Sequence, residues 1–278
     1  GATDFFNDRI EIYSSALDFE FRGTHDWLRN VLTPEYTHMV TLQSAMKLPK
    51  MTPAIYLQWL NYEEEKRPDV LYGYPNGIVS YPISGVAVPA WFAEGTAQYE
   101  RQQLGYEKWD SQRDMILRSR VIAGDMLSYN EMGQFSSVTS LKAESIYNSG
   151  YGLVRFISQQ YGEDKLKLLV DHLSDLDNFS MDAAFRGAIN KSGQDVYKEW
   201  KDYLEKDYNK RLSGVKETKI SGDLIQTEGF ANLNPKFSPD GKYIAFMSNE
   251  KADYFVSQMY LYNTATKTKE PLPFTSGS

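Results

Sequence analysis

The sequence has no cysteine among its 278 residues. This absence excludes disulfide bonds, zinc sites built from cysteine ligands and catalysis by a thiol. It does not fix the cellular compartment, because many exported proteins also lack cysteine. Any chemistry in the chain therefore has to come from other side chains.

The sequence also lacks an excess of basic charge and a long hydrophobic run. The formal net charge is −7 and no long basic segment occurs, which argues against nucleic acid or an anionic membrane surface as a partner. The longest uncharged apolar stretch, residues 74–93, is interrupted by Pro75, Pro82, Gly85 and Pro89, which argue against a membrane helix. We expect no transmembrane segment in this chain.

What the sequence does contain is typical of a folded globular protein. Hydrophobic residues make up 41% and aromatic residues 14% of the chain. The length is enough for one large domain or two modest ones, each with a substantial core. The hydrophobic pattern then indicates how these domains are divided.

The first 210 residues predict one short strand followed by helices. Residues 8–13 alternate charged and apolar side chains, which favours a strand. Amphipathic segments with start and stop signals predict the helices. The expected helices begin near residue 26 and reach past residue 40, then cover residues 52–66, a segment starting at residue 89, and residues 111–122, 141–161, 164–173, 180–189 and 193–210. The fold class is therefore α+β, mainly helical with a small N-terminal sheet.

An incomplete metal motif lies in the first predicted helix. Glu35 and His38 occupy the second and last places of an H-E-x-x-H pattern, and Pro34 stands where the first histidine is required. In such a helix the two histidines are about 40° apart around the axis, so both face one metal ion. The intervening glutamate activates the bound water as a general base. One ligand position is thus missing here.

A third ligand position is present further along the chain. A glutamate on a following helix is one standard way to complete such a site, and Glu94 lies in the segment Trp91-Phe-Ala-Glu-Gly-Thr-Ala-Gln-Tyr99. We expect Glu35, His38 and Glu94 to converge on one cleft. Two ligand positions and the base are present, but proline has no side-chain donor atom.

Pro34 also affects the helix itself. Proline inside a helix removes one hydrogen bond and crowds the carbonyl four residues earlier, at a cost of roughly 3 kcal/mol. We expect a kink near residues 30–34. The alternative is a helix that restarts there, with Thr33 as the cap and Pro34 as the first helical residue.

These segments resemble the gluzincin-type zinc metallopeptidases of the peptidase MA superfamily. The resemblance covers about residues 8–210 and rests on three segments, residues 26–40, 89–99 and 147–157. It implies a zincin-like peptidase domain with His38 and Glu94 as metal ligands, Glu35 as the base and zinc as the cofactor. Related peptidases usually carry more strands before this point, so we expect the chain to begin partway through its domain.

The resemblance also makes two tyrosines candidates for the site. Tyr147 and Tyr151 lie four residues apart on one helix, where related peptidases can use a tyrosine to hydrogen-bond the tetrahedral intermediate. Core packing is the simpler interpretation for at least one of them. His25 is too far around the helix to replace the missing ligand, and His172 is expected on the surface of a distant helix.

The composition changes after residue 213. We expect a linker at residues 214–221 and then about four antiparallel strands in residues 222–278. The segment 232–248 resembles a repeat of a TolB-like β-propeller, with Pro239-Asp-Gly241 as hairpin-turn chemistry. One blade cannot close a ring, since propellers have about four to eight blades. The resemblance implies that the remaining blades lie in a longer protein.

Three functions are compatible with these features. The first is a metallopeptidase-like domain of an exported protein, periplasmic or on the cell surface with its signal peptide removed, which has lost catalysis because of Pro34 and binds a peptide or protein in its cleft. Zinc would then be absent or weakly bound. The second is an active zinc peptidase that uses Glu35 to activate water. The third is a scaffold without catalytic activity.

Overall fold

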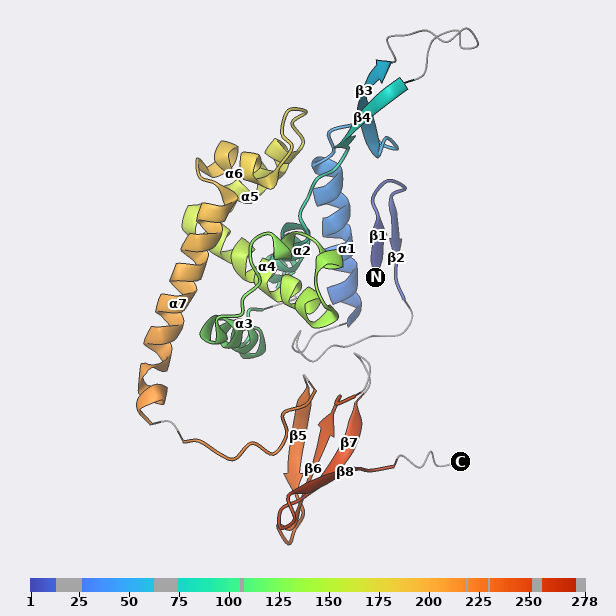
Figure 1. Ribbon diagram of the computed structural model, residues 1–278. Helices are drawn as coiled ribbons and strands as arrows, with labels where there is room; N and C mark the ends of the chain where they lie inside the picture. The colour runs from blue at the N-terminus through green and yellow to red at the C-terminus, as the bar shows by residue number, and fades with distance from the viewer. Residues whose placement is uncertain are drawn as a thin grey trace. The chain divides into compact units, whose positions relative to one another are not determined.

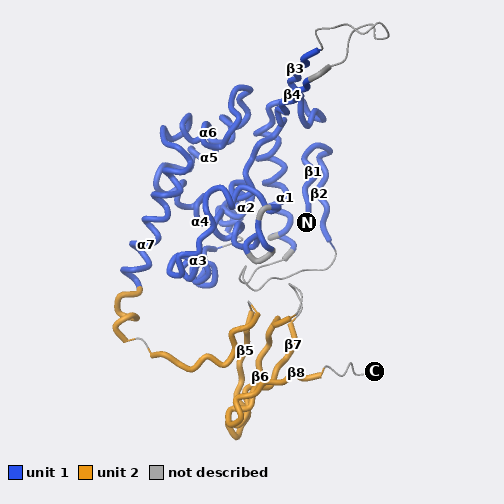
Figure 2. Tube along the Cα trace, in the orientation of Figure 1, with its two compact units in different colours: residues 1–211 blue, residues 212–278 orange. Residues whose placement is uncertain are grey.

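A computed structural model describes most of the chain, and its described part divides into two compact units. The units are Gly1–Arg211 and Leu212–Ser278 (Figure 2). Within the described residues the fold is α+β, with seven α-helices and three small antiparallel sheets. The residues described are 1–13, 27–62, 75–105, 108–218, 220–229, 231–251 and 257–273.

The first unit begins with a short hairpin that lies against a long helix. Strand β1 (Ala2–Asp4) pairs with β2 (Arg9–Glu11), and α1 (Trp27–Ser44) lies beside this hairpin (Figure 1). Strand β2 falls within the predicted strand, whereas β1 was not predicted. Helix α1 continues through Pro34 without interruption, so a restart at Thr33 is wrong, and the expected kink stays a prediction.

A strand pair replaces one of the predicted helices. The helix expected over residues 52–66 is wrong, because β3 (Ala54–Tyr62) is a strand that pairs along its length with β4 (Pro75–Ser84). Residues 63–66 lie outside the described part. Isoleucine, tyrosine and tryptophan in β3 favour strands over helices once a partner strand is available. Prolines are tolerated in β4 because both strands of a two-stranded sheet are edges.

Helix α2 (Ala90–Gln103) and helix α4 (Ser140–Tyr161) form the centre of the first unit. Their backbones approach very closely at two glycines. A Cβ atom on Gly95 would lie 2.5 Å from the carbonyl oxygen of Gly150, and a Cβ on Gly150 would collide with the backbone of Trp91. Only glycine allows this approach, which brings the Glu94 end of α2 next to the N-terminal half of α4.

The other helices surround this pair and complete one hydrophobic core. They are α3 (Ser111–Ala123), α5 (Asp164–Leu173), α6 (Met181–Ile189) and α7 (Gly193–Glu217), and all four agree closely with the predicted segments. Helix α7 extends beyond the predicted end and through residues 214–217 of the expected linker. Fully buried side chains from six helices meet in the core, among them Trp91, Leu117, Tyr151, Leu169, Phe185 and Trp200.

The second unit is a four-stranded antiparallel sheet in sequential order. Its strands are β5 (Asn232–Phe237), β6 (Tyr243–Ser248), β7 (Gln258–Asn263) and β8 (Thr268–Pro271). Gly241 has φ 70° in the predicted turn between β5 and β6. A hydrogen bond from Lys269 on β8 holds the pKa of the buried Glu250 carboxyl at about 2, and Gln226 also donates to that carboxylate at 2.9 Å. The sequence pattern indicates the opening of a further repeat over residues 271–278; Pro271 ends β8, and residues 274–278 lie outside the described part.

The described helices include none with the length and apolar character needed to cross a bilayer.

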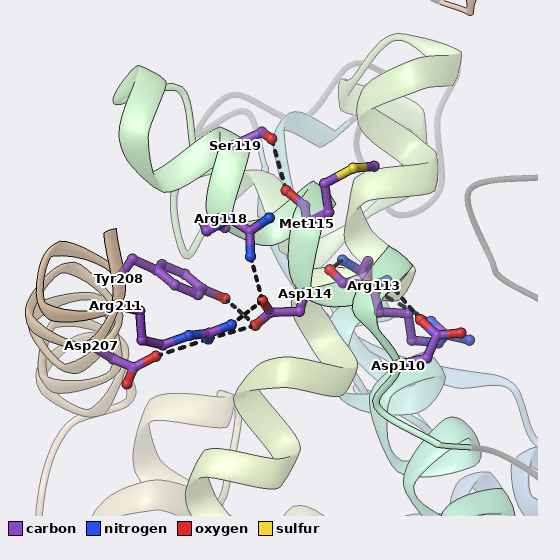
Figure 3. Close-up of polar contacts among 10 residues, drawn as sticks. Asp110, Arg113, Asp114, Met115, Arg118, Ser119, Asp207, Tyr208 and Arg211 are labelled. Carbon is purple, nitrogen blue, oxygen red and sulfur yellow. Dashed lines mark hydrogen bonds and ion pairs between the residues drawn. The ribbon is translucent and has the colours of Figure 1, made fainter. Parts of the chain in front are cut away.

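A buried carboxylate joins α3 to α7 in the first unit. Asp114 on α3 accepts two hydrogen bonds from Arg211, at 2.8 and 3.2 Å, and one from Tyr208 at 3.2 Å, both on α7 (Figure 3). Arg118 donates a further bond at 2.8 Å. Burial raises the pKa of the Asp114 carboxyl, but the hydrogen bonds and the charge of Arg211 outweigh this effect, so the pKa lies below its ordinary value of 3.8.

We predict that Asp114→Asn lowers the free energy of unfolding by about 2 kcal/mol at neutral pH, because charged hydrogen bonds are lost. A depressed pKa contributes stability that is fully present above pH 3.8 and disappears as the pH falls through the folded-state value. Urea unfolding should therefore give the same difference at pH 7 and pH 5 and a smaller one at pH 3. Asp171→Asn, which removes an exposed pair with Lys167, is the control and should have little effect. A difference that grows toward low pH would contradict the assignment.

Candidate functional site

The sequence-predicted residues of α1 and α2 line a single cavity. Its volume is about 380 Å³, and Glu35 and His38 from α1 face it together with Glu94 from α2. Glu35 and His38 are three residues apart, which places them on the same face of α1. Helices α1 and α2 pack against each other, so Glu94 reaches this face from the opposite wall.

His38 and Glu94 form a direct pair in the cavity. The His38 Nε2 atom lies 3.3 Å from Glu94 Oε2, and the two side chains are only 12% and 17% exposed. Burial by itself lowers the pKa of the His38 imidazole, but the hydrogen bond and charge of Glu94, together with the charge of Glu35, outweigh it and raise the pKa above its ordinary value of 6.5. The pair therefore stabilises the fold fully below pH 6.5 and loses that contribution as the pH rises through the raised value.

Glu35 has a different partner. Its carboxylate Oε2 accepts a hydrogen bond of 2.6 Å from the Thr3 hydroxyl, which also lies 2.8 Å from the main-chain oxygen of Glu35. Thr3 belongs to β1, and this strand lines the cavity beside α1. The general base expected from the motif is thus held by the N-terminal hairpin, through a residue that sequence analysis did not identify.

The two candidate tyrosines have different surroundings. Tyr147 lines the cavity, as expected for a residue near the reacting groups. Tyr151 is fully buried, and its hydroxyl donates to Gln102 at 2.5 Å while its ring contacts Trp109 edge-on. The structure therefore places Tyr151 in the core and not at this cavity, which agrees with core packing as the simpler interpretation for one of the two tyrosines. One helical turn, about 5.4 Å, carries it past the cavity and into the core.

Of the other two histidines, only His172 belongs to the described part of the chain, and it does not line the cavity. His172 lies on α5 and pairs with Asp175 at 3.1 Å, which agrees with the expected location on a distant helix surface. His25 lies outside the described residues. No described residue therefore provides a second imidazole near His38.

Two polar residues on α2 complete the wall. Gln98 and Arg101 line the cavity four and seven residues after Glu94, so both share its helix face. Sequence analysis did not identify Arg101. The helical period was the available signal, because positions four and seven residues apart repeat on one side of a helix.

The residues present do not fit a zinc site with three protein ligands. Pro34 lines the cavity at the place of the first ligand but offers no donor atom. Among the described residues, no group of three or more histidine, aspartate or glutamate side chains is arranged to hold a metal ion. His38 and Glu94 instead bond to each other. What the arrangement provides is a polar cavity with an acid–base pair, a second carboxylate and an arginine.

The protonation of His38 should depend on Glu94. In Glu94→Gln the charge that raises the His38 pKa is removed, and burial then becomes the dominant effect, so we predict that the pKa falls. Titration of the histidine Cε1–H resonances by NMR measures this shift. The His172 resonance is the internal control, because the ring of His172 pairs with Asp175. At any one pH it should be the same in Glu94→Gln and in the unmodified chain. An unchanged His38 pKa would show that the two side chains do not interact in solution.

Comparisons of this chain with protein-family models, with curated proteins and with solved structures found no match.

Proposed function

We propose that the first unit is a peptide-binding domain with a metallopeptidase-like framework and a disabled metal centre. The observation that carries this proposal is the cavity shared by Glu35, His38 and Glu94, in which Pro34 occupies the place of the missing ligand. The spacing of these residues matches that of a gluzincin site. The chemistry differs, because a proline occupies the place of one metal ligand.

Hydrolysis of a peptide bond requires an activated water molecule and stabilisation of the developing oxyanion. In the zinc peptidases the metal ion supplies both. Here the remaining ligand side chains are paired with each other, and Glu35 is bound to Thr3. Without a positioned electrophile, a carboxylate base alone does not polarise the scissile carbonyl. The proposal therefore assigns binding rather than catalysis.

The cavity is suited to an extended peptide. Its volume is within the range of ligand sites, about 300–1,000 Å³, and its wall combines apolar side chains such as Val31 and Leu42 with Gln98 and Arg101. Amide groups and Arg101 suit peptide carbonyls and acidic side chains. The apolar residues suit the hydrocarbon part of a side chain of the bound peptide.

A working zinc peptidase is the second candidate. The same convergence of Glu35, His38 and Glu94 favours it, provided that water takes the place of the missing histidine. A scaffold without a functional cavity is the third. The second unit fits any of the three as a TolB-like blade of a longer exported protein, which its sequential four-stranded sheet and Pro-Asp-Gly turn support.

Restoring the motif should create metal affinity. We predict that Pro34→His binds zinc at least about tenfold more tightly than the unmodified chain, since even loss of supporting groups around a metal site costs roughly 10–100-fold. Isothermal titration calorimetry measures this difference. Pro34→Ala is the matched control. It removes the proline from the helix, whose cost there is up to about 3 kcal/mol, and it adds no donor atom for a metal ion.

Stoichiometric zinc in the unmodified chain, removed by a chelator together with peptidase activity, would overturn the proposal in favour of the second candidate. Equal and weak affinity in all three proteins would show that the remaining residues no longer form a ligand set.

Filling the cavity should abolish peptide binding. Ala93 lines the cavity and can be replaced by phenylalanine, whereas Ala123 is exposed at the end of α3 and provides a matched control. On an array of short immobilised peptides we predict that the unmodified chain and Ala123→Phe bind the same subset and that Ala93→Phe binds none. Binding of the same peptides by Ala93→Phe would place the binding surface elsewhere and favour the scaffold.

A further inference from the structure

The described part of the first unit contains a second cavity. Its volume is about 200 Å³, and it is lined by residues of α3, α4 and α7 together with Trp109. It shares no lining residue with the cavity around His38. Five aromatic side chains line it, from Trp109, Phe156, Trp200, Tyr203 and Tyr208, together with arginine and aspartate side chains.

The carboxylates of this cavity are already neutralised. Asp114 is held by Arg211 and Arg118, and Asp207 accepts a hydrogen bond of 3.1 Å from Arg211 (Figure 3). Neither carboxylate is therefore available as the main partner of a cationic ligand. Once these ion pairs are counted, the charged side chain that remains in the cavity wall is positive.

That charge belongs to Arg155. Its guanidinium carbon lies 4.9 Å from the centre of the Trp109 ring and 5.9 Å from that of Tyr151, so aromatic faces hold it in place. Within the described residues it makes no hydrogen bond or ion pair, and its Nε atom is buried without a partner. A guanidinium carries five N–H donors, and a carboxylate satisfies two of them at once.

We propose that this cavity binds a small carboxylate that carries one aromatic ring. The carboxylate pairs with Arg155 on the cavity wall, and the ring packs among Trp109, Trp200 and Tyr203. An apolar cavity of about 150 Å³ holds one benzene molecule, so a volume of this order admits one ring and a short acid side chain. The aromatic side chains favour the ring, and the guanidinium of Arg155 favours the acid.

The probe for this site is 3-phenylpropionate, and its neutral isostere is 3-phenylpropanol. Trp109 and Trp200 line the cavity, so binding should change tryptophan fluorescence in a saturable way. We expect the unmodified full chain to bind the acid at least about tenfold more tightly than the alcohol, as charged hydrogen bonds require. This comparison involves no substitution and therefore does not depend on a variant folding.

Two matched substitutions locate the site. Arg155→Gln removes the proposed partner and should weaken acid binding at least about tenfold, while binding of the alcohol stays unchanged. Arg101→Gln removes the arginine of the other cavity and should leave acid binding as it is. Circular dichroism checks that both variants are folded.

Equal binding of acid and alcohol, or no saturable binding of either up to their solubility limits, would overturn the proposal. Loss of acid binding in Arg101→Gln but not in Arg155→Gln would place the acid in the first cavity and would overturn it as well.

Discussion

The close approach of α2 and α4 at Gly95 and Gly150 is the contact on which the architecture of the first unit depends. With no Cβ at either position, the two backbones touch, and Trp91 and Phe92 are buried in the core as a result. This packing fixes the rotation of α2. Glu94, Gln98 and Arg101 then share the face that looks toward α1, and the same packing places Tyr147 at the cavity.

The chemistry of the first cavity follows from one residue within this arrangement. In a complete H-E-x-x-H helix, the side chain at position 34 would contribute a ligand beside His38. Proline contributes none, and its place in α1 costs one backbone hydrogen bond. The helix nevertheless continues through it, so Glu35 and His38 keep their common face. His38 and Glu94 then satisfy each other, and Glu35 is taken up by Thr3.

The opposite side of the first unit is organised by arginines rather than by glycines. Arg211 bridges Asp114 and Asp207 and ties α7 to α3, and Arg118 reinforces the same carboxylate. Each charge in this group has a partner within hydrogen-bond distance. Arg155 is different, because its guanidinium stacks on Trp109 and Tyr151 without an acceptor among the described residues. The cavities around His38 and Arg155 thus differ in character: carboxylates and an imidazole line the first, whereas aromatic rings and arginine–aspartate pairs line the second.

The sequence by itself determined the helical elements whose periods and caps are strong. The segments that became α3 to α7 were predicted closely, as was the turn at Gly241, because capping residues and helical periodicity act over a few neighbouring residues. The spacing of Glu35 and His38 also predicted their common face, whereas Glu94 was expected beside them from the metal-site motif. Local pattern failed over β3, where aromatic and β-branched residues form a strand only because β4 pairs with them. It also failed for Thr3, since the contact of a hairpin with α1 depends on residues far apart in the chain. The tertiary structure alone decided which side chains face a cavity and which donors are left without an acceptor, because both depend on how whole elements pack.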